Sequence, residues 1–243
     1  MKIEGRNAVR ETLLAGGRVA KLFASNSSKD KVFNDIITLA KERKIKIQFV
    51  SNEILNKESL THHHQGLIAV VEEYEYATLE DIFKTANEKN QPPFILILDG
   101  VEDPHNLGSI IRVCDCLGIH GVIIGKNRAC GVNETVIKTS AGATNYVNVV
   151  KVTNINDAIR ELKEKGVWVY ACELGGNKIS STDLTGPIAI VMGSEGFGVS
   201  ALTKKLCDGI FTIDMVGKVN SLNVSVATGI ALYEAYTQRS EKK

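Results

Sequence analysis

Four short apolar runs in the second half of the chain constrain its fold more than any other feature. They cover residues 94–98, 121–124, 167–170 and 188–192. Stretches with helical character separate them, among them residues 155–165. Apolar strands that alternate with helices are typical of a parallel sheet covered by helices on both faces. The sequence therefore predicts an α/β domain after Pro93, ending in a long helix over 222–239.

The first 75 residues show helix and strand patterns on a smaller scale. Helices are expected at 6–15, ended by Gly16 and Gly17, and at 30–43, with strands at 21–24, 45–50 and 67–71. A charged stretch, 72–91, leads to the pair Pro92–Pro93. We therefore expect a small α/β domain over 1–75, a linker with a short helix over 76–92, and the larger domain over 93–243.

Composition limits the class of protein. Of the residues 44% are hydrophobic and four are proline, which fits a globular chain. No apolar run approaches the roughly 20 residues of a membrane span, and the N-terminus lacks a signal-peptide core. The five cysteines have no framework spacing, and we expect them reduced in a cytoplasmic protein without a membrane segment.

The charge balance gives no general sign of a nucleic-acid partner, because the net charge is only +1. An RNA partner must therefore be argued from local basic patches, such as residues 41–46 and 204–205. Each patch is equally well explained as a solvated helix end or face.

Polar side chains interrupt three segments that otherwise have the pattern of a core. Ser221, Asn223 and Ser225 lie within 220–227, Glu195 lies among three glycines in 192–198, and Asn106 and Arg112 lie in 99–112. A buried polar group without a partner costs about 1–3 kcal/mol, so such groups cap helices or hold ligands. Glycines let a backbone approach a ligand closely, but 192–198 has neither a dinucleotide nor a P-loop pattern.

Simpler interpretations exist for each of these residues. Arg112 lies almost opposite an apolar helical stripe and on its own is an ordinary surface arginine. Asn106 is a candidate helix cap, Glu195 a turn carboxylate, and the hydroxyl of Ser225 a group bonded within its helix. The run His62–His64 does not suggest a metal site, because adjacent histidines point in different directions.

Taken in order, the segments 99–112, 192–198 and 220–227 resemble motifs one, two and three of the SPOUT superfamily. Within it they are similar to the SpoU-type, TrmH-like RNA ribose 2′-O-methyltransferases, and most similar to the bacterial enzymes that methylate a guanosine ribose in 23S rRNA. The resemblance implies a deep trefoil knot in the C-terminal domain, a rare exception among folds. It also implies an RNA-binding role for residues 1–75. One departure is Asp214, which follows Ile213 where the family usually has proline.

The resemblance implies S-adenosylmethionine-dependent methylation of a ribose 2′-OH without a metal. By position, the catalytic residues are Asn106, Arg112, Glu195, Ser221 and Asn223, and the cofactor-binding residues, acting through their backbone, are Gly193, Ile213 and Leu222. The family also works as a homodimer. The outer stripe of the last helix (Val226, Ile230 and Tyr233) fits this, although it equally fits packing on the chain's own sheet. Two alternatives stay open: a tRNA ribose methyltransferase, and a non-catalytic RNA-binding or ribosome-assembly factor.

Overall fold

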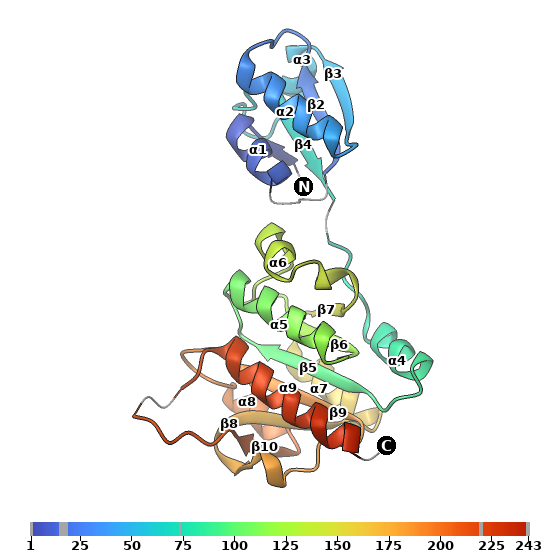
Figure 1. The fold of residues 1–243 in the computed structure, drawn as a ribbon, viewed down its shortest axis with the longest axis vertical. Helices are drawn as coiled ribbons and strands as arrows, with labels where there is room; N and C mark the ends of the chain where they lie inside the picture. Colours follow the sequence, from blue (N-terminus) through green and yellow to red (C-terminus); the bar gives the residue numbers. More distant parts are fainter. Residues whose placement is uncertain (1, 15–18, 73, 219–220, 242–243) are drawn as a thin grey trace. The chain divides into compact units, whose positions relative to one another are not determined.

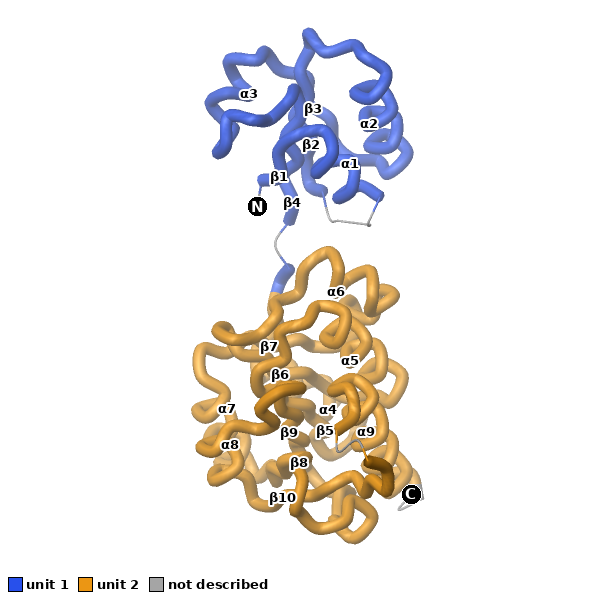
Figure 2. The backbone as a smooth tube through the Cα atoms, turned by 90° about the vertical axis from the view of Figure 1, so that its left-hand side faces the viewer, with its two compact units in different colours: residues 1–75 blue, residues 76–243 orange. Residues whose placement is uncertain are grey.

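The computed structural model describes residues 2–14, 19–72, 74–218 and 221–241. The chain divides into two compact units, residues 1–75 and 76–243 (Figure 2). The expected helix stop at Gly16 and Gly17 lies outside the described residues, as does Asn220, the first residue of the third polar segment.

The first unit is a four-stranded sheet with helices on both faces (Figure 1). Its strands are β1 (Lys2–Glu4), β2 (Val19–Ser25), β3 (Lys46–Val50) and β4 (Leu67–Val71), and its helices are α1 (Arg6–Leu14), α2 (Lys31–Glu42) and α3 (Asn52–Glu58). The strand order is β1-β4-β2-β3, in which only β2 and β3 run parallel. The helices α1 and α2 pack on one face and α3 on the other, so both faces are buried.

Most elements of the first unit lie within two residues of the sequence prediction. The exceptions are β1 and α3, which the prediction lacks because three and seven residues are too short to show a period. Asp30 begins α2 by accepting a hydrogen bond from the N–H of Phe33. The apolar residues Phe33, Ile36, Ile37 and Ala40 form the buried face of this helix.

The second unit is a six-stranded parallel sheet between two layers of helices (Figure 1). Its strands are β5 (Phe94–Asp99), β6 (Gly121–Gly125), β7 (Asn148–Val152), β8 (Trp168–Lys178), β9 (Ile188–Gly193) and β10 (Gly209–Thr212). Its helices are α4 (Leu79–Glu88), α5 (Pro104–Cys116), α6 (Glu134–Thr139), α7 (Ile155–Glu164), α8 (Ala201–Leu206) and α9 (Val224–Glu241). The predicted α/β class is therefore confirmed, while the trefoil knot stays a prediction.

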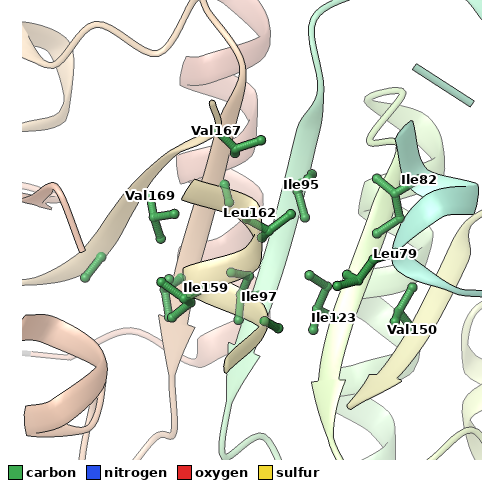
Figure 3. Close-up of a cluster of buried hydrophobic side chains, with 14 of the residues drawn as sticks. Leu79, Ile82, Ile95, Ile97, Ile123, Val150, Ile159, Leu162, Val167 and Val169 are labelled. Atoms are coloured by element: carbon green, nitrogen blue, oxygen red, sulfur yellow. The ribbon is translucent and has the colours of Figure 1, made fainter. Parts of the chain in front are cut away.

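One face of this sheet carries the apolar cluster drawn in Figure 3. Ile95 and Ile97 of β5 point toward Ile159 and Leu162 of α7, and α4 and α8 pack beside that helix. Alternate residues of a strand point to opposite faces, so the remaining strand residues face α5 and α9. No helix among the described residues is long and apolar enough to cross a membrane.

Residues 76–92, expected as a linker, belong to the second unit. They contain α4, whose capping box joins Thr78 and Asp81. Leu79 and Ile82 of this helix are buried against the sheet. The charged residues between them face away, and this is why the segment has the composition of a linker.

The strand order β10-β8-β9-β5-β6-β7 places a switch point between β5 and β9. After β5 the chain continues to β6, which lies on one side of β5 in the sheet, whereas β9 lies on the other side of β5 with β8 and β10. Loops that diverge in this way open a crevice at the carboxyl ends of the strands, where parallel sheets bind ligands. Two of the polar segments follow these two strands directly, and Asp99 and Gly193 are paired in register.

Candidate functional site

Three residues from the three polar segments meet at this switch point. The Nδ2 of Asn106 donates to Glu195 Oε1 at 3.1 Å, and the Nδ2 of Asn223 donates to Asn106 Oδ1 at 3.0 Å and to Glu195 Oε1 at 2.5 Å. Asn106 is buried, whereas Glu195 lies at the surface of the site. No described residue donates to Glu195 Oε2, so this oxygen is available to a ligand. We call these three residues the polar cluster.

Helix capping explains part of the cluster. Asn223 caps α9, because its Oδ1 accepts hydrogen bonds from the N–H groups of Ser225 and Val226 at 3.0 and 3.4 Å. Its Nδ2 is then left for the cluster, so one side chain serves both the helix and the site. Asn106 is not a cap: the cap of α5 is Asp103, which accepts from the N–H of His105.

A tight turn after β9 holds Glu195 in place. Ser194 and Gly198 close this turn with two backbone hydrogen bonds of 3.2 and 3.0 Å. A side chain on Gly193 would collide with the backbone of Gly198 and Val199, and Gly198 itself has a φ of +64°. Glycine is therefore required at both ends of the turn.

A cavity of about 440 Å³ lies beside the cluster. Gly193, Ile213 and Leu222, the three residues expected to bind the cofactor, all line it, as do Glu195 and Ser221. Its volume falls within the roughly 300–1,000 Å³ range of small-molecule sites. Ser221 makes no hydrogen bond to any described residue, so it borders the cavity without joining the cluster.

The thiol of Cys172 also lines this cavity. Burial, together with the neighbouring Glu173 carboxylate, raises the pKa of Cys172 to about 12. The thiol is therefore protonated at neutral pH and is a poor nucleophile. The other four cysteines are unpaired as well.

Arg112 lies away from the cluster within the same chain. It is six residues along α5 from Asn106, which separates the two by about 9 Å along the helix axis. Its side chain is exposed and forms no hydrogen bond or ion pair with any described residue. Instead it borders an apolar groove of about 600 Å³ between α5 and α9, which also contains Cys116, Ile230 and Tyr233.

The outer stripe of α9 does not pack on the chain's own sheet. Val226, Ile230 and Tyr233 are 51%, 42% and 62% exposed, whereas Leu232 and Ala235 of the same helix are fully buried. The interpretation that this stripe belongs to the core is therefore wrong. An exposed apolar groove of this kind is typical of a surface that a partner covers.

Two further sequence features have local explanations. Asp214, the departure from the family pattern, forms an ion pair with Lys178 of β8 at 3.2 Å. Among the three adjacent histidines, His64 contacts Asn56 at 2.9 Å and accepts a hydrogen bond from the N–H of Gly66.

A second and larger cavity adjoins the cluster, and the sequence did not indicate it. It measures about 770 Å³ and shares the 194–198 turn with the smaller cavity. Glu102, Asn127 and Arg128 lie on its wall. The only available signal was that polar residues follow the strands β5 and β6, where loops of a parallel sheet gather.

Comparison with known proteins agrees with this architecture. The model of the SpoU rRNA Methylase family matches residues 93–233, and the RNA 2′-O ribose methyltransferase substrate binding model matches residues 2–77. The chain is 44% identical to YacO of Bacillus subtilis, named for the TrmH family of tRNA/rRNA methyltransferases, over 97% of this chain and 95% of that one. A Staphylococcus haemolyticus protein with the same family name is 42% identical over 98% and 96%. The chain therefore belongs to the SpoU methylase family.

Solved structures share the fold. The SpoU methyltransferase AviRb of Streptomyces viridochromogenes, solved with AdoMet, matches with a TM-score of 0.66 at 22% identity, over 99% of this chain and 91% of that one. The AdoMet-bound rRNA methyltransferase of Sinorhizobium meliloti matches with a TM-score of 0.63 at 25% identity, over 96% and 85%.

Proposed function

We propose that this protein transfers a methyl group from S-adenosylmethionine to the 2′-OH of a guanosine ribose in 23S rRNA. One observation carries the proposal: the polar cluster of Asn106, Glu195 and Asn223 borders a cavity lined by Gly193, Ile213 and Leu222. Three segments far apart in the sequence thereby provide both a small-molecule cavity and polar groups for an acceptor. Family membership and the AdoMet-bound structures of similar fold support the choice of cofactor.

The residues around the smaller cavity fit this cofactor. Gly193 exposes backbone where a side chain would not fit, and Ile213 and Leu222 add apolar walls. Backbone N–H and C=O groups would contact the edge of the adenine while the apolar side chains cover its faces. When bound, S-adenosylmethionine supplies a methyl group activated by a sulfonium.

The side chains of the cluster would align the acceptor. A ribose 2′-OH is a weak acid and a poor nucleophile, so its orientation matters. Glu195 has one carboxylate oxygen without a hydrogen-bond partner among the described residues, and it can accept a hydrogen bond from the hydroxyl. Asn106 and Asn223 hold that carboxylate, and Ser221 borders the same space. No step in this scheme requires a metal.

Arg112 is assigned as a clamp for the substrate phosphate and as a stabiliser of the developing alkoxide. A guanidinium is always protonated in proteins, so it is a poor base and a good anion ligand. Because Arg112 lies away from the cluster of its own chain, we assign the working enzyme as a homodimer. In it, Arg112 of the partner subunit completes each site, and the α5–α9 groove forms the contact.

Mixed dimers test this arrangement. Chains with Arg112→Ala and chains with Asn223→Ala carry different tags, are co-expressed, and are purified as a mixed dimer. Each parent should be nearly inactive, and the mixed dimer should regain activity because one of its two sites is intact. A mixed dimer as inactive as its parents would reject the shared site, and a monomeric wild type would reject the dimer.

We assign residues 1–75 the role of selecting the RNA, with the chemistry confined to the domain after Pro93, for which a knot is predicted. The match of the substrate binding model to residues 2–77 supports this division. Deleting residues 1–75 should weaken RNA binding, above all its salt-dependent part, and leave binding of S-adenosylmethionine intact. Unchanged methylation by the shortened chain would contradict the assignment.

The ribosomal substrate is tested by mapping ribose methylations in cells with and without this gene. Cells without the gene should lack a single 2′-O-methylguanosine in their 23S rRNA. This result would fit a cytoplasmic enzyme that acts during rRNA processing. Loss from a tRNA would move the enzyme to the other substrate class, which the names of its relatives also include. No loss at all would favour a non-catalytic assembly factor, although such a factor has no need to keep all five site residues.

A further inference from the structure

The larger cavity, of about 770 Å³, is the part of the second unit that the proposed reaction has not used. Its walls are the loops after β5, β6, β7 and β9, so it lies at the carboxyl edge of the sheet. Both Asn106 and Glu195 line it. It therefore opens onto the same polar cluster as the cofactor cavity, and a molecule bound in it would reach the cluster.

Two charged side chains on its wall have no partner in the part of the chain that the structure describes. Glu102 and Arg128 are exposed, and neither forms a hydrogen bond or ion pair with any described residue. By contrast, Asp99 accepts from the N–H of Ser200 at 2.9 Å and Asp103 caps α5. Besides Oε2 of Glu195, which the proposed reaction assigns to the ribose, the carboxylate of Glu102 and the guanidinium of Arg128 are therefore charged groups of this wall that no described residue binds.

The backbone fixes the loops that carry these two residues. The N–H of Cys130 donates to the carbonyl of Val101 at 2.9 Å, which ties the loop after β6 to the loop after β5. Arg128 itself has a φ of +52°, a left-handed conformation that side chains other than glycine rarely adopt. Strained backbone of this kind gathers at ligand sites, where it directs a side chain.

A ligand that satisfies both groups must offer donors to a carboxylate and acceptors to a guanidinium. Among the neutral RNA bases, only guanine has two adjacent donors, N1–H and N2–H₂, that match the two oxygens of a carboxylate. Guanine also offers O6 and N7, the pair that arginine binds with two hydrogen bonds. Adenine, cytosine and uracil lack the adjacent pair of N–H donors.

The turn between the two cavities adds an aromatic side chain. Phe197 lines both cavities and is 96% exposed. Proteins that bind an unstacked RNA base commonly stack it on such a ring.

We propose that the larger cavity holds the target guanine, with Glu102 on its N1–H and N2–H₂ edge, Arg128 on O6 and N7, and Phe197 stacked on its face. This assignment rests on the proposed ribose methylation and adds the residues that select the base. It places the ribose at the polar cluster, between the base and the methyl donor.

Base analogues in a synthetic RNA test each contact separately. The RNA carries the mapped target as guanosine, as inosine, which lacks the N2 amine, or as 7-deazaguanosine, which lacks N7. The wild type should lose at least about fivefold in kcat/KM on each analogue, the lower end of what one base contact discriminates. Glu102→Gln, which keeps only one acceptor oxygen, should lower kcat/KM on guanosine and reduce the penalty for inosine alone. Arg128→Met, which has no hydrogen-bond donor, should abolish the penalty for 7-deazaguanosine alone.

Controls separate the proposed guanine pocket from the proposed ribose methylation on which it rests. Glu88→Gln changes an exposed glutamate on α4 and should keep both penalties at wild-type size. All variants should bind S-adenosylmethionine with the affinity of the wild type, as measured by calorimetry. Wild-type affinity would show that the variants are folded. Methyl transfer to the ribose of a nucleotide whose base is not guanine, or both penalties unchanged in both variants, overturns the guanine pocket and leaves the ribose methylation standing. No transfer to any RNA by the wild type overturns both.

Discussion

The helices α5 and α9 form two surfaces with opposite character. At their N-terminal ends, Asn106 and Asn223 bond to each other and to Glu195, so these polar groups find partners within the chain. Further along the same helices, Arg112 has no partner among the described residues and borders an apolar groove with Ile230 and Tyr233. One helix pair thus carries both a polar cluster whose groups bond to each other within the chain and an apolar surface that no described part of the chain covers.

This difference shows how much of the site a single chain builds. Asn106 of the cluster is buried and must be satisfied inside the chain, because an unpaired buried polar group costs about 1–3 kcal/mol. An exposed arginine beside apolar side chains has no such requirement until another molecule covers it. We therefore interpret the cluster as pre-organised in the monomer and the groove as a surface that acquires its role on assembly.

The largest effect is expected from the cluster. Asn223→Ala removes two donated hydrogen bonds and the cap of α9, so Glu195 keeps only the longer hydrogen bonds from Asn106 and from the N–H of Val224. Methyl transfer should fall by about 100-fold or more, the usual cost of a misplaced catalytic group. Loss of the cap should lower the free energy of unfolding by about 1 kcal/mol. Rates from labelled S-adenosylmethionine and thermal unfolding measure the two effects.

Ser225→Ala is the matched control for this change. It removes the hydroxyl that donates to Asn223 Oδ1 at 2.5 Å but keeps both donors of the asparagine. Its rate should stay within about threefold of the wild type, since a neutral hydrogen bond contributes roughly 1 kcal/mol or less. Equal losses in both variants would mean that the Ser225 hydroxyl, which holds Asn223 Oδ1, matters for the reaction as much as the amide donors of Asn223 do.

The second effect concerns the groove. Ile230→Asp places a charge in the proposed contact, where an uncompensated buried charge costs about 3–5 kcal/mol. The protein should become monomeric in sedimentation velocity and lose about 10-fold or more of its activity, while its affinity for S-adenosylmethionine stays near the wild-type value. Leu202→Asp on α8 changes a somewhat more exposed apolar residue on the opposite face of the sheet and should have no effect on assembly. A dimeric Ile230→Asp protein would show that the groove is not the dimer contact.

The sequence foresaw the cluster better than the groove, for a physical reason. The polar residues at the ends of β5 and β9 stand out against apolar strands, and their convergence follows from a parallel sheet. Periodicity does not decide the role of the outer stripe of α9, because it identifies an apolar face without showing what covers it. Only its exposure in the structure separates the two possibilities.

Other elements escaped prediction because their signals are weak or mixed. The six-residue helices α6 and α8 are too short for a helical period. The edge strand β7 carries the exposed Lys151, and β8 continues past its apolar run through the polar segment that ends at Lys178. In α4 the many charged residues outnumber the buried Leu79 and Ile82, so the composition of this packed helix is that of a linker.

A third effect should change stability and leave the rate at neutral pH unaltered. The buried His120 follows the end of α5; its Nδ1 accepts from the N–H of Phe94 at 3.0 Å and its Nε2 contacts Gln91. Burial, and then the nearby Lys89 and Arg239, lower the pKa of His120 to about 4. The cluster and the groove both include residues of α5. His120, which follows this helix, therefore tests how far the stability of the region around α5 depends on one buried side chain.

The sign of the pH dependence follows from that lowered pKa. Unfolding lets His120 take up a proton at its ordinary pKa of about 6.5, so acid favours the unfolded chain. Its contribution is complete above pH 6.5 and is lost as the pH falls toward 4, by on the order of 3 kcal/mol. Thermal unfolding between pH 4.5 and 7.5 measures this loss, and His120→Gln should flatten it. An equally steep curve for the variant would assign the loss to other groups.

The smallest effect is expected outside both surfaces, at the loop that carries Ile213. There Asp214 pairs with Lys178 at 3.2 Å, and the two side chains are 57% and 71% exposed. Exposed ion pairs contribute about 0–1 kcal/mol, so Asp214→Asn should change the affinity for S-adenosylmethionine by less than about threefold, and 0.5 M salt should remove even that difference. Calorimetry at low and high salt measures both values. A loss of tenfold or more would mean that the ion pair holds the cofactor loop where the family usually has proline. The cofactor cavity would then depend on an interaction outside the polar cluster. The site would then have three determinants: the cluster, which one chain completes, the groove, which a partner completes, and the loop of Asp214.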